Sequence, residues 1–329
     1  MKPAVDYTEV ASGLLRLDAE AEIHRITTAV RMQVSRELRR QGVVVAISGG
    51  VDSSVTAALC ARALGPDRVV GLMMPERDSS SETVRLSRLL AETLGIRTAS
   101  EDITAILESV GCYRRQEEAY RGVVPEYQTG WQAKIVLPSV TENAGFRFFS
   151  LVTRSPEGTE LTSRLDADTY LQILAATNFK QRVRKMLEYY YADRNNYAVA
   201  GTPNRLEYDQ GFFVKLGDGA ADLKPIAHLY KTQVYQLAEA LGVPEEIRSR
   251  PPTTDTYSMP QSQEEFYFSL PYAAMDVCLY GKNHGMRIAE VATMLGLALD
   301  QIERVFTDIE QKRRTTRYQH LAPSLVDPV

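Results

Sequence analysis

The sequence has 329 residues, of which 44% are hydrophobic and 24% charged, and this composition is ordinary for a soluble globular protein of one or two domains. A net charge of −4 and a pI near 5.7 argue against a nucleic-acid-binding surface, which usually carries a basic excess. No signal peptide or long apolar run occurs. We therefore expect a cytoplasmic protein without a membrane span.

The cysteines and histidines make several kinds of site improbable. The three cysteines are far apart and form no CxxC pair, so we expect no disulfide framework, zinc site or thiol relay, and a reducing compartment fits. The four histidines show no metal-ligand spacing. The cysteines are Cys60, Cys112 and Cys278.

The first predicted element is an amphipathic helix over residues 18–41, closed by Gly42. Its apolar residues recur at helical spacing: Ile23, Ile26, Val30, Val34 and Leu38. This pattern suits a helix that packs on the core, and it equally suits a helix that forms a dimer interface.

Strands and helices then alternate up to residue 103. The predicted strands are Val43–Ile47, Val69–Met74 and one within Ile96–Ile103, and the predicted helices are Ser53–Leu64 and Glu82–Leu94. This rhythm predicts βαβ units in an α/β fold, a doubly wound parallel sheet with helices on both faces. Ligands of such sheets bind beyond the carboxyl ends of the strands.

A glycine-rich turn, Ser48–Ser54, follows the first strand at that position. Gly49 and Gly50 lack a Cβ, so the backbone can bend sharply and approach a ligand. Ser53 and Ser54 stand where a new helix exposes unpaired N–H groups, which favour an anion. The turn therefore predicts a phosphate site. It is not a Walker A loop, because no lysine follows the glycines.

Residues 111–177 interrupt the α/β rhythm, and we interpret them as a β-rich insertion. Lys134–Leu137 and Phe146–Thr153 have the composition of strands, and Thr159–Leu165 would return after a turn at 155–158. The insertion could be a flap over the site or a surface hairpin without a role in it.

The α/β pattern resumes at residue 178. We predict a helix over Asn178–Ala192, a strand over Tyr197–Gly201 and a helix over Tyr230–Leu241. Two C-terminal helices, over 286–296 and 298–313, complete a single domain that spans residues 1–329.

Two carboxylates at neighbouring strand ends suggest a metal site. Glu207, in the block Gly201–Glu207, follows a predicted strand and could share a Mg²⁺ with Asp52, since magnesium takes one or two carboxylates plus phosphate oxygens and water. Taken alone, Glu207 would be a solvated helix charge.

Three further blocks carry polar groups that could meet a ligand. Lys215–Ile226 holds a Gly-Asp-Gly loop with two carboxylates, Leu229–Thr232 places Lys231 at a helix start, and Arg250–Asp255 is a rigid loop with hydroxyls. Each block alone is an ordinary turn or surface charge, so their meaning depends on their combination.

The turn Ser48–Ser53 resembles the SGGxDS signature of the ATP pyrophosphatase (PP-loop) families, which have an adenine nucleotide alpha hydrolase-like fold and adenylate a substrate. Six blocks in order resemble the ammonia-using catalytic domain of the NAD synthetase family, from about residue 18 to the final helix except for residues 111–177. The blocks are Ser48–Ser53, Asn178–Met186, Gly201–Glu207, Lys215–Asp222, Leu229–Thr232 and Pro252–Asp255.

The resemblance implies roles for individual residues. ATP would be bound by Ser48, Gly49, Gly50, Asp52, Ser53, Thr202, Lys231 and Thr253. Mg²⁺ would be bound by Asp52 and Glu207. The acceptor would be bound by Asn178, Arg182, Lys215, Asp218 and Asp222. Asp52 and Lys231 would be the catalytic pair, and Lys312 stands where the family carries a basic pair that usually reads His-Lys or Tyr-Lys. The family also implies a homodimer that includes the 18–41 helix.

The implied reaction is adenylation of the nicotinate carboxylate of deamido-NAD by ATP, followed by attack of ammonia to give NAD, AMP and pyrophosphate. Positioning and charge neutralisation would do most of the work, in agreement with the absence of a Cys-His or Ser-His-Asp arrangement. The chain has no room for a glutamine amidase domain, so we expect free ammonia or ammonia from a partner protein.

Departures from the family concern the acceptor half. Ser258–Phe268 replaces the usual GQ-[TS]-DE-x-E-[LI]-G run, and Gly281–Gly285 replaces a shorter acidic segment. An amide ligase for a different small carboxylate is therefore an alternative. A non-catalytic ATP-binding subunit is a further one, although such a subunit should have lost Asp52 and Glu207. RNA thiolation is disfavoured by the missing cysteine pair and basic excess.

Overall fold

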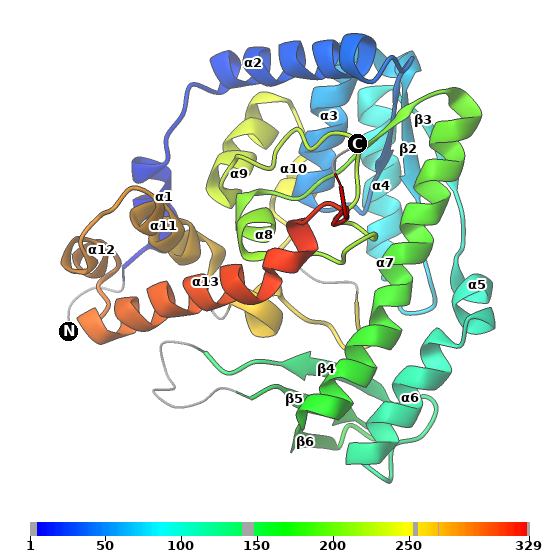
Figure 1. The fold of residues 1–329 in the computed structure, drawn as a ribbon, viewed down its shortest axis with the longest axis vertical. Coiled ribbons are helices and arrows are strands. Elements are labelled where there is room, and N and C mark those ends of the chain that lie inside the picture. The colour runs from blue at the N-terminus through cyan, green and yellow to red at the C-terminus, as the bar shows by residue number, and fades with distance from the viewer. Residues whose placement is uncertain (1–4, 140–147, 253–255, 269, 328–329) are drawn as a thin grey trace.

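The computed structural model describes residues 5–139, 148–252, 256–268 and 270–327 (Figure 1). The helices are α1 Tyr7–Leu14, α2 Ala19–Met32, α3 Val51–Leu64, α4 Ser81–Leu94, α5 Thr104–Ser109, α6 Cys112–Val123, α7 Ala167–Asn195, α8 Arg205–Gln210, α9 Lys231–Ala240, α10 Glu245–Arg248, α11 Tyr272–Asn283, α12 Ile288–Leu295 and α13 Leu299–His320. The strands are β1 Val43–Ala46, β2 Val69–Met73, β3 Arg97–Ser100, β4 Gln132–Val136, β5 Ser150–Arg154, β6 Glu160–Arg164 and β7 Ala198–Ala200.

The larger sheet is parallel and has the strand order β3-β2-β1-β7. Val43 of β1 lies opposite Val69 of β2 on one side and Ala198 of β7 on the other, so β1 is an inner strand. The apolar, β-branched sequence of β1 is typical of a strand that is covered on both faces. The predicted doubly wound α/β fold is confirmed.

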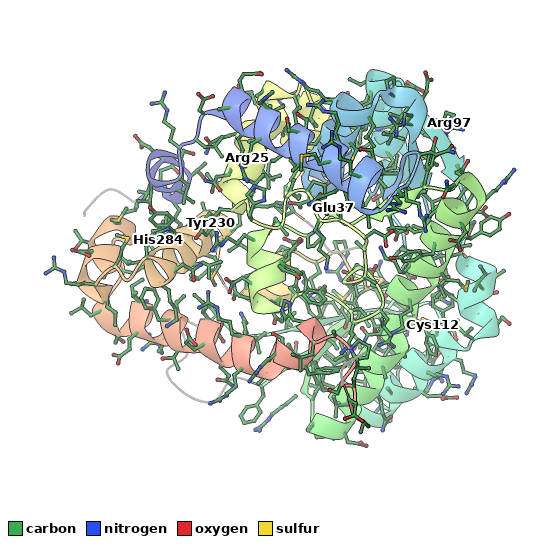
Figure 2. All side chains as sticks on the ribbon, turned by 45° about the horizontal axis from the view of Figure 1, so that its top comes forward. Arg25, Glu37, Arg97, Cys112, Tyr230 and His284 are labelled. Carbon is green, nitrogen blue, oxygen red and sulfur yellow. The ribbon has the colours of Figure 1, made fainter. Side chains whose placement is uncertain are left out.

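Alternate residues of β1 enter two different cores, because successive side chains of a strand point to opposite faces. Val43 and Val45 pack with α2, α3 and α9 on one face. Val44 packs with residues of α5, α6 and α7 on the other face. Helices therefore cover both faces, and the free, buried Cys112 lies in the second core, at the start of α6 (Figure 2).

A second, antiparallel sheet in the order β4-β5-β6 occupies the predicted β-rich stretch. The described strands are shifted by a few residues from the predicted ones, and residues 146 and 147 of the predicted second strand lie outside the described residues. The turn between β5 and β6 lies at 155–159, where a turn was predicted at 155–158. The stretch 111–177 is not all β, however. It begins with α6 and ends with the first part of α7, which starts at Ala167 instead of Asn178.

The long helix α7 connects the two sheets. In Figure 1 it runs down the right-hand side, from the parallel sheet above to the antiparallel sheet below. Asp166 caps its first turn by accepting a hydrogen bond from Thr169 N at 2.8 Å, so the helix has a local start signal that the strand prediction overlooked.

A helical layer built from both ends of the chain covers the remaining side. α1 and α11–α13 share one core, which also holds Tyr230 (Figure 2). The sequence predicted α12 and a shorter α13, but it did not predict α1 or α11. The predicted 18–41 helix is α2 followed by a π-helical turn at Gln33–Glu37. None of the helices in the described part of the chain combines the length and apolarity needed to cross a membrane.

Candidate active site

A cavity of about 1080 Å³ opens at the carboxyl ends of the parallel strands. It reaches from the Ser48–Ser53 turn across α7 to α13. Most residues that the sequence singled out line this one cavity: Ser48, Gly50, Asp52, Ser53, Asn178, Arg182, Thr202, Glu207, Lys215, Asp218, Lys231 and Lys312. Gly49 and Asp222 are not part of the lining, and Thr253 lies outside the described residues.

The Ser48–Ser53 turn has the geometry of an anion site. Gly49 has a φ of +68°, and a Cβ there would lie 2.9 Å from both Leu86 Cβ and Thr83 O, so only glycine fits. Gly50 is the N-cap of α3, whose unpaired N–H groups and positive end face the cavity. Ser48 N and Ser53 Oγ are 3.2 Å apart, and this hydrogen bond keeps the turn closed.

Arg250 places a guanidinium group over this turn. Its Nη1 lies 3.5 Å from the point where a Cβ of Gly49 would stand, and its Nη2 donates to Thr83 Oγ1 at 3.3 Å. Arg250 lines the cavity and makes no ion pair with any described residue. The sequence drew attention to the hydroxyls of the Arg250–Asp255 block but not to this cation.

Asp52 and Lys231 form the charged centre of the site. Asp52 lies in the first turn of α3, and its Oδ2 accepts a hydrogen bond from the Lys231 ammonium. Its Oδ1 accepts from Asn204 Nδ2 at 3.0 Å. Lys231 is 2% exposed, so its charge depends on this carboxylate for compensation. The predicted catalytic pair is thus in direct contact.

Glu207 is the second carboxylate of this cluster. Its Oε2 accepts from Asn204 N at 3.1 Å and its Oε1 from Gln263 Nε2 at 2.9 Å. Burial and the charge of nearby Asp52 raise the pKa of Glu207 to about 8. Burial lowers the pKa of Lys231, but the charges of Asp52 and Glu207 raise it by more, so the net effect is a raised pKa.

The two carboxylates fit a Mg²⁺ ion that would also be bound by phosphate. Two neighbouring carboxylates repel each other, and the charge of Asp52 is, after burial, the next cause of the raised pKa of Glu207. A divalent cation relieves this repulsion. Each oxygen has a second lone pair beyond its hydrogen bond. No cluster of three or more His, Cys, Asp or Glu ligands occurs among the described residues. The remaining ligands would have to be phosphate oxygens and water.

Asp276 on α11 holds the helix start that carries Lys231. Its carboxylate accepts from Lys231 N at 3.2 Å, Thr232 N at 2.6 Å and Thr232 Oγ1 at 2.6 Å. Asp276 is fully buried, and burial raises its pKa to about 7. The sequence reasoning missed this residue because its element was not predicted.

The far end of the cavity contains most of the predicted acceptor residues. Asn178 and Arg182 line it from α7, and Arg182 Nε donates to Lys215 O at 3.4 Å. Lys215 Nζ donates to Tyr318 O at 2.8 Å, which fixes the end of α13. Asp218 Oδ1 accepts from Val214 N at 2.7 Å, and burial raises the pKa of Asp218.

Asp222 and Lys312 make contacts within the protein. Asp222 Oδ2 accepts from Val199 N at 2.7 Å, next to β7 and away from the cavity lining. The hydrogen bond gives Asp222 a role in closing the Gly-Asp-Gly segment onto β7. Lys312 lines the cavity, but its Nζ donates to Tyr267 O at 2.7 Å and pairs with Asp308 at 2.8 Å.

A buried ionic cluster in the cavity wall was not predicted. Lys180 on α7 is 1% exposed and contacts Glu76 Oε1 at 2.7 Å, Asp78 Oδ2 at 3.0 Å and Thr256 O at 3.1 Å. Tyr113 OH also donates to Glu76, at 2.7 Å. The cluster joins the loop after β2, helix α7 and the segment that begins at Thr256. Its only sequence signal is the Lys within the Asn178–Met186 block.

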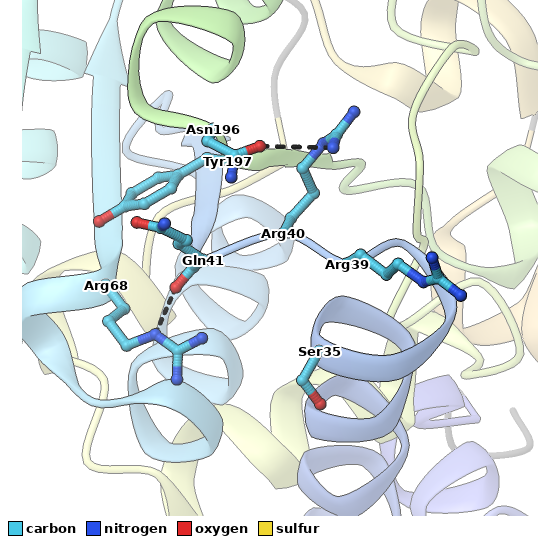
Figure 3. Close-up of a pocket in the computed structure, with 7 residues that line it drawn as sticks. All are labelled: Ser35, Arg39, Arg40, Gln41, Arg68, Asn196 and Tyr197. Atoms are coloured by element: carbon cyan, nitrogen blue, oxygen red, sulfur yellow. Dashed lines mark hydrogen bonds between the residues drawn. The ribbon is translucent and has the colours of Figure 1, made fainter.

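A second hollow, of about 550 Å³, lies elsewhere on the molecule (Figure 3). Arg39, Arg40, Arg68 and Tyr197 line it, around the entrances to β1, β2 and β7. It is therefore at the amino ends of the parallel strands, where this fold does not place its ligands. None of the predicted site residues lines it.

Comparison with known proteins agrees with the motif blocks. The family model described as NAD synthase matches residues 22–125 and 156–319. The NH(3)-dependent NAD(+) synthetase of Mesorhizobium japonicum is 61% identical over 312 residues, which are 95% of this chain and 98% of that protein. The NH(3)-dependent NAD(+) synthetase of Rhizobium rhizogenes is 54% identical and covers 99% of this chain and 98% of that protein.

A solved structure shares the fold. The NH3-dependent NAD synthetase from Campylobacter jejuni, in complex with the nitrate ion, aligns with a TM-score of 0.62 at 20% identity, over 94% of this chain and 100% of that one. Since the family model matches far more than half of the chain and the two curated relatives match over nearly its full length, the chain belongs to the NAD synthase family.

Proposed function

We propose that this protein is an ammonia-dependent NAD synthetase, which uses ATP to convert the nicotinate carboxylate of deamido-NAD into the amide of NAD. The observation that carries the proposal is the contact between Asp52 and Lys231 beside a lysine-free glycine turn, with Glu207 next to them. This cluster suits pyrophosphate release from ATP. The 61% identity with an enzyme of this name supports the choice of acceptor.

The reaction would take place in two steps. A carboxylate oxygen of deamido-NAD bonds to the α-phosphorus of ATP while the bond to the pyrophosphate oxygen breaks, which gives an acyl-adenylate. Ammonia then bonds to the acyl carbon, the nitrogen releases a proton to water, and AMP leaves with the bridging oxygen. Neither step requires a protein nucleophile.

The residues of the chain would act by binding and charge neutralisation. The Ser48–Ser53 turn, Arg250 and Lys231 would hold the β- and γ-phosphates that become pyrophosphate, and Thr202 would contact ATP as well. Asp52 and Glu207 would hold Mg²⁺, which when bound neutralises phosphate charge. Asn178 and Arg182 would bind the acceptor at the other end of the cavity.

We also propose a homodimer in the cytoplasm. The family resemblance places the 18–41 helix in the interface, and exposed Met186 and Tyr190 on α7 give a further apolar surface that a second copy could cover. The buried, unpaired thiols of Cys60, Cys112 and Cys278 are compatible with a reducing compartment. A ligase for another carboxylate is the weaker candidate, because relatives that match nearly the whole chain are named as NAD synthetases.

The test is to incubate the purified chain with ATP, Mg²⁺, ammonium and deamido-NAD and to measure NAD and AMP together. Equal amounts of NAD and AMP are expected, and glutamine in place of ammonium should give neither. A protein that binds ATP but makes no NAD under these conditions would overturn the assignment.

A further inference from the structure

Leu137 and Phe149, from the segment that the family model leaves unmatched, line the active-site cavity. Residues 126–155 lie outside the match, and their described part includes all of β4 and all of β5. β4 is at the edge of its sheet, so one side of the strand has no strand partner. Residues 258–261 lie along this edge and form hydrogen bonds with β4. They therefore cover a strand edge that would otherwise be open.

Hydrogen bonds between described residues connect the two segments. Ala133 N donates to Ser258 Oγ at 2.9 Å, and Met259 N donates to Ala133 O at 3.1 Å. Gln132 Nε2 donates to Ser258 O at 3.2 Å, and the buried Gln261 donates to the carbonyl of Ile135. Two of these bonds depend on the side chains of Ser258 and Gln261, so this sequence specifically encodes the contact.

Packing reinforces the hydrogen bonds. Tyr257 is buried in the same core as Ala133 and Ile135, and Phe266 packs against this core. The rings of Tyr257 and Phe266 meet edge to face, with centroids 5.6 Å apart. The segment is therefore fixed to the insertion at both ends of the stretch 257–266.

Gln263 lies between these fixed points and contacts Glu207, the carboxylate that would bind Mg²⁺. It lines the cavity, and its Nε2 donates to Glu207 Oε1 at 2.9 Å. The backbone of Asn204 holds the other oxygen of Glu207, at 3.1 Å. A donor on each oxygen keeps the carboxylate in one orientation and leaves a lone pair of each oxygen available. Removing Gln263 would leave Glu207 with a single donor.

We propose that Gln263 is a positioning residue for Glu207, and that the β4 edge of the 126–155 insertion holds Gln263 in place. The inference rests on the proposed function, in which Glu207 binds Mg²⁺. Outer contacts of this kind orient metal ligands, and their loss costs roughly 10- to 100-fold in metal affinity or activity. The insertion would thus be part of the catalytic site and not a surface decoration.

The experiment measures AMP release by the full chain as a function of Mg²⁺ concentration and, independently of activity, the dissociation constant of Mg²⁺ from the chain by calorimetry, which should shift in parallel with the half-maximal concentration. Gln263→Leu should raise the Mg²⁺ concentration for half-maximal rate by about tenfold, with a smaller effect on the rate at saturating Mg²⁺. Ser258 lies outside the cavity lining. Ser258→Ala should raise the Mg²⁺ concentration for half-maximal rate by a few-fold, roughly the worth of one hydrogen bond. The control Thr162→Ala, an exposed position on β6, should change nothing.

The double variant Ser258→Ala with Gln263→Leu decides whether the two effects share one route. If the insertion acts through Gln263, the double variant should match Gln263→Leu alone, because coupled residues are non-additive. An unchanged Mg²⁺ response in Gln263→Leu, or fully additive effects, would overturn the inference. If Ser258→Ala fails to fold, Gln132→Ala removes a neighbouring bond and replaces it in the cycle.

Failure of the proposed function can be told apart from failure of this inference. Glu207→Gln should weaken the Mg²⁺ response more strongly than Gln263→Leu does. If Glu207→Gln leaves that response intact, the metal assignment is wrong and the inference falls with it. If Glu207→Gln responds as expected and Gln263→Leu does not, only the positioning role of Gln263 is wrong.

Discussion

Asp276 Oδ2 accepts hydrogen bonds from both the backbone N and the hydroxyl of Thr232, each at 2.6 Å, and so joins α11 to the first turn of α9. This turn begins with Lys231, whose ammonium contacts Asp52. A residue in the C-terminal helical layer thereby sets the position of a cation in the proposed ATP site. The C-terminal helical layer is thus linked through a buried carboxylate to the pair formed by Lys231 and Asp52.

The stability of the protein should depend on pH through Asp276. Its pKa is about 7 in the folded protein and near 3.8 when exposed, so the folded state binds the proton more tightly. The Asp276 contribution to the free energy of unfolding should therefore fall as pH rises from about 4 to about 7. The hydrogen bonds from Thr232 and from the backbone of Lys231, and then the charge of Lys231, oppose the rise in pKa but do not cancel it.

Chemical denaturation of the wild type and of Asp276→Asn across this pH range would check the prediction. The variant has lost a hydrogen-bond acceptor and should be less stable, but the difference from wild type should shrink as pH rises. A difference that stays constant from pH 4 to pH 7 would contradict the raised pKa of Asp276.

Asp52→Asn should nearly abolish AMP formation. The change removes a proposed metal ligand and leaves the buried Lys231 ammonium without its ion-pair partner. Loss of such electrostatic stabilisation typically costs about 100- to 1000-fold in rate, and an unpaired buried charge costs about 3–5 kcal/mol of stability. AMP release and thermal unfolding should be measured together, with Asp67→Asn, away from the cavity, as the control. Near-wild-type AMP release would refute the role of Asp52.

The parallel half of the fold could be predicted because its signals are local. Apolar runs such as Val43–Ile47 and glycines such as Gly65 and Gly95 mark where elements begin and end. α11 escaped prediction because eight of its twelve residues are buried, so it has little of the polar face that periodicity detects. Its missing prediction also hid Asp276.

The sequence was enough to predict that the motif residues share one cavity, but not which residues form hydrogen bonds with them. Asp52, Glu207 and Lys231 each belong to a recognisable block, and the carboxyl ends of parallel strands bring those blocks together. The contact of Gln263 with Glu207 joins residues 56 positions apart in sequence, and no local pattern records it. Such contacts depend on how segments distant in the sequence pack together, which requires the structure.

Arg250→Ala should raise the KM for ATP by about tenfold or more and weaken inhibition by pyrophosphate. The guanidinium lies over the Ser48–Ser53 turn without an ionic partner among the described residues, so a phosphate would gain its charge-assisted hydrogen bonds, worth about 1.5–3 kcal/mol. Arg250→Lys should retain part of this affinity, since lysine keeps the charge but loses the fork geometry.

The matched control for Arg250 is Arg85→Ala on the neighbouring helix α4. Arg85 pairs with Glu82 and Glu246 and does not line the cavity, so its loss should leave the KM for ATP unchanged. If both variants shift the KM equally, the effect reflects general surface charge and the specific role of Arg250 is wrong.

Lys180→Met should strongly destabilise the protein. The change leaves the carboxylates of Glu76 and Asp78 beside each other without their shared cation, and Glu76 is 5% exposed. Removing one partner of a buried ion pair typically costs about 3–5 kcal/mol, whereas the exposed pair Arg114–Glu118 should contribute only about 0–1 kcal/mol. Urea denaturation of Lys180→Met and Arg114→Ala would compare the two directly. Equal losses would mean that water or rearrangement compensates the carboxylates, and that the cluster does not hold the loop after β2 to α7.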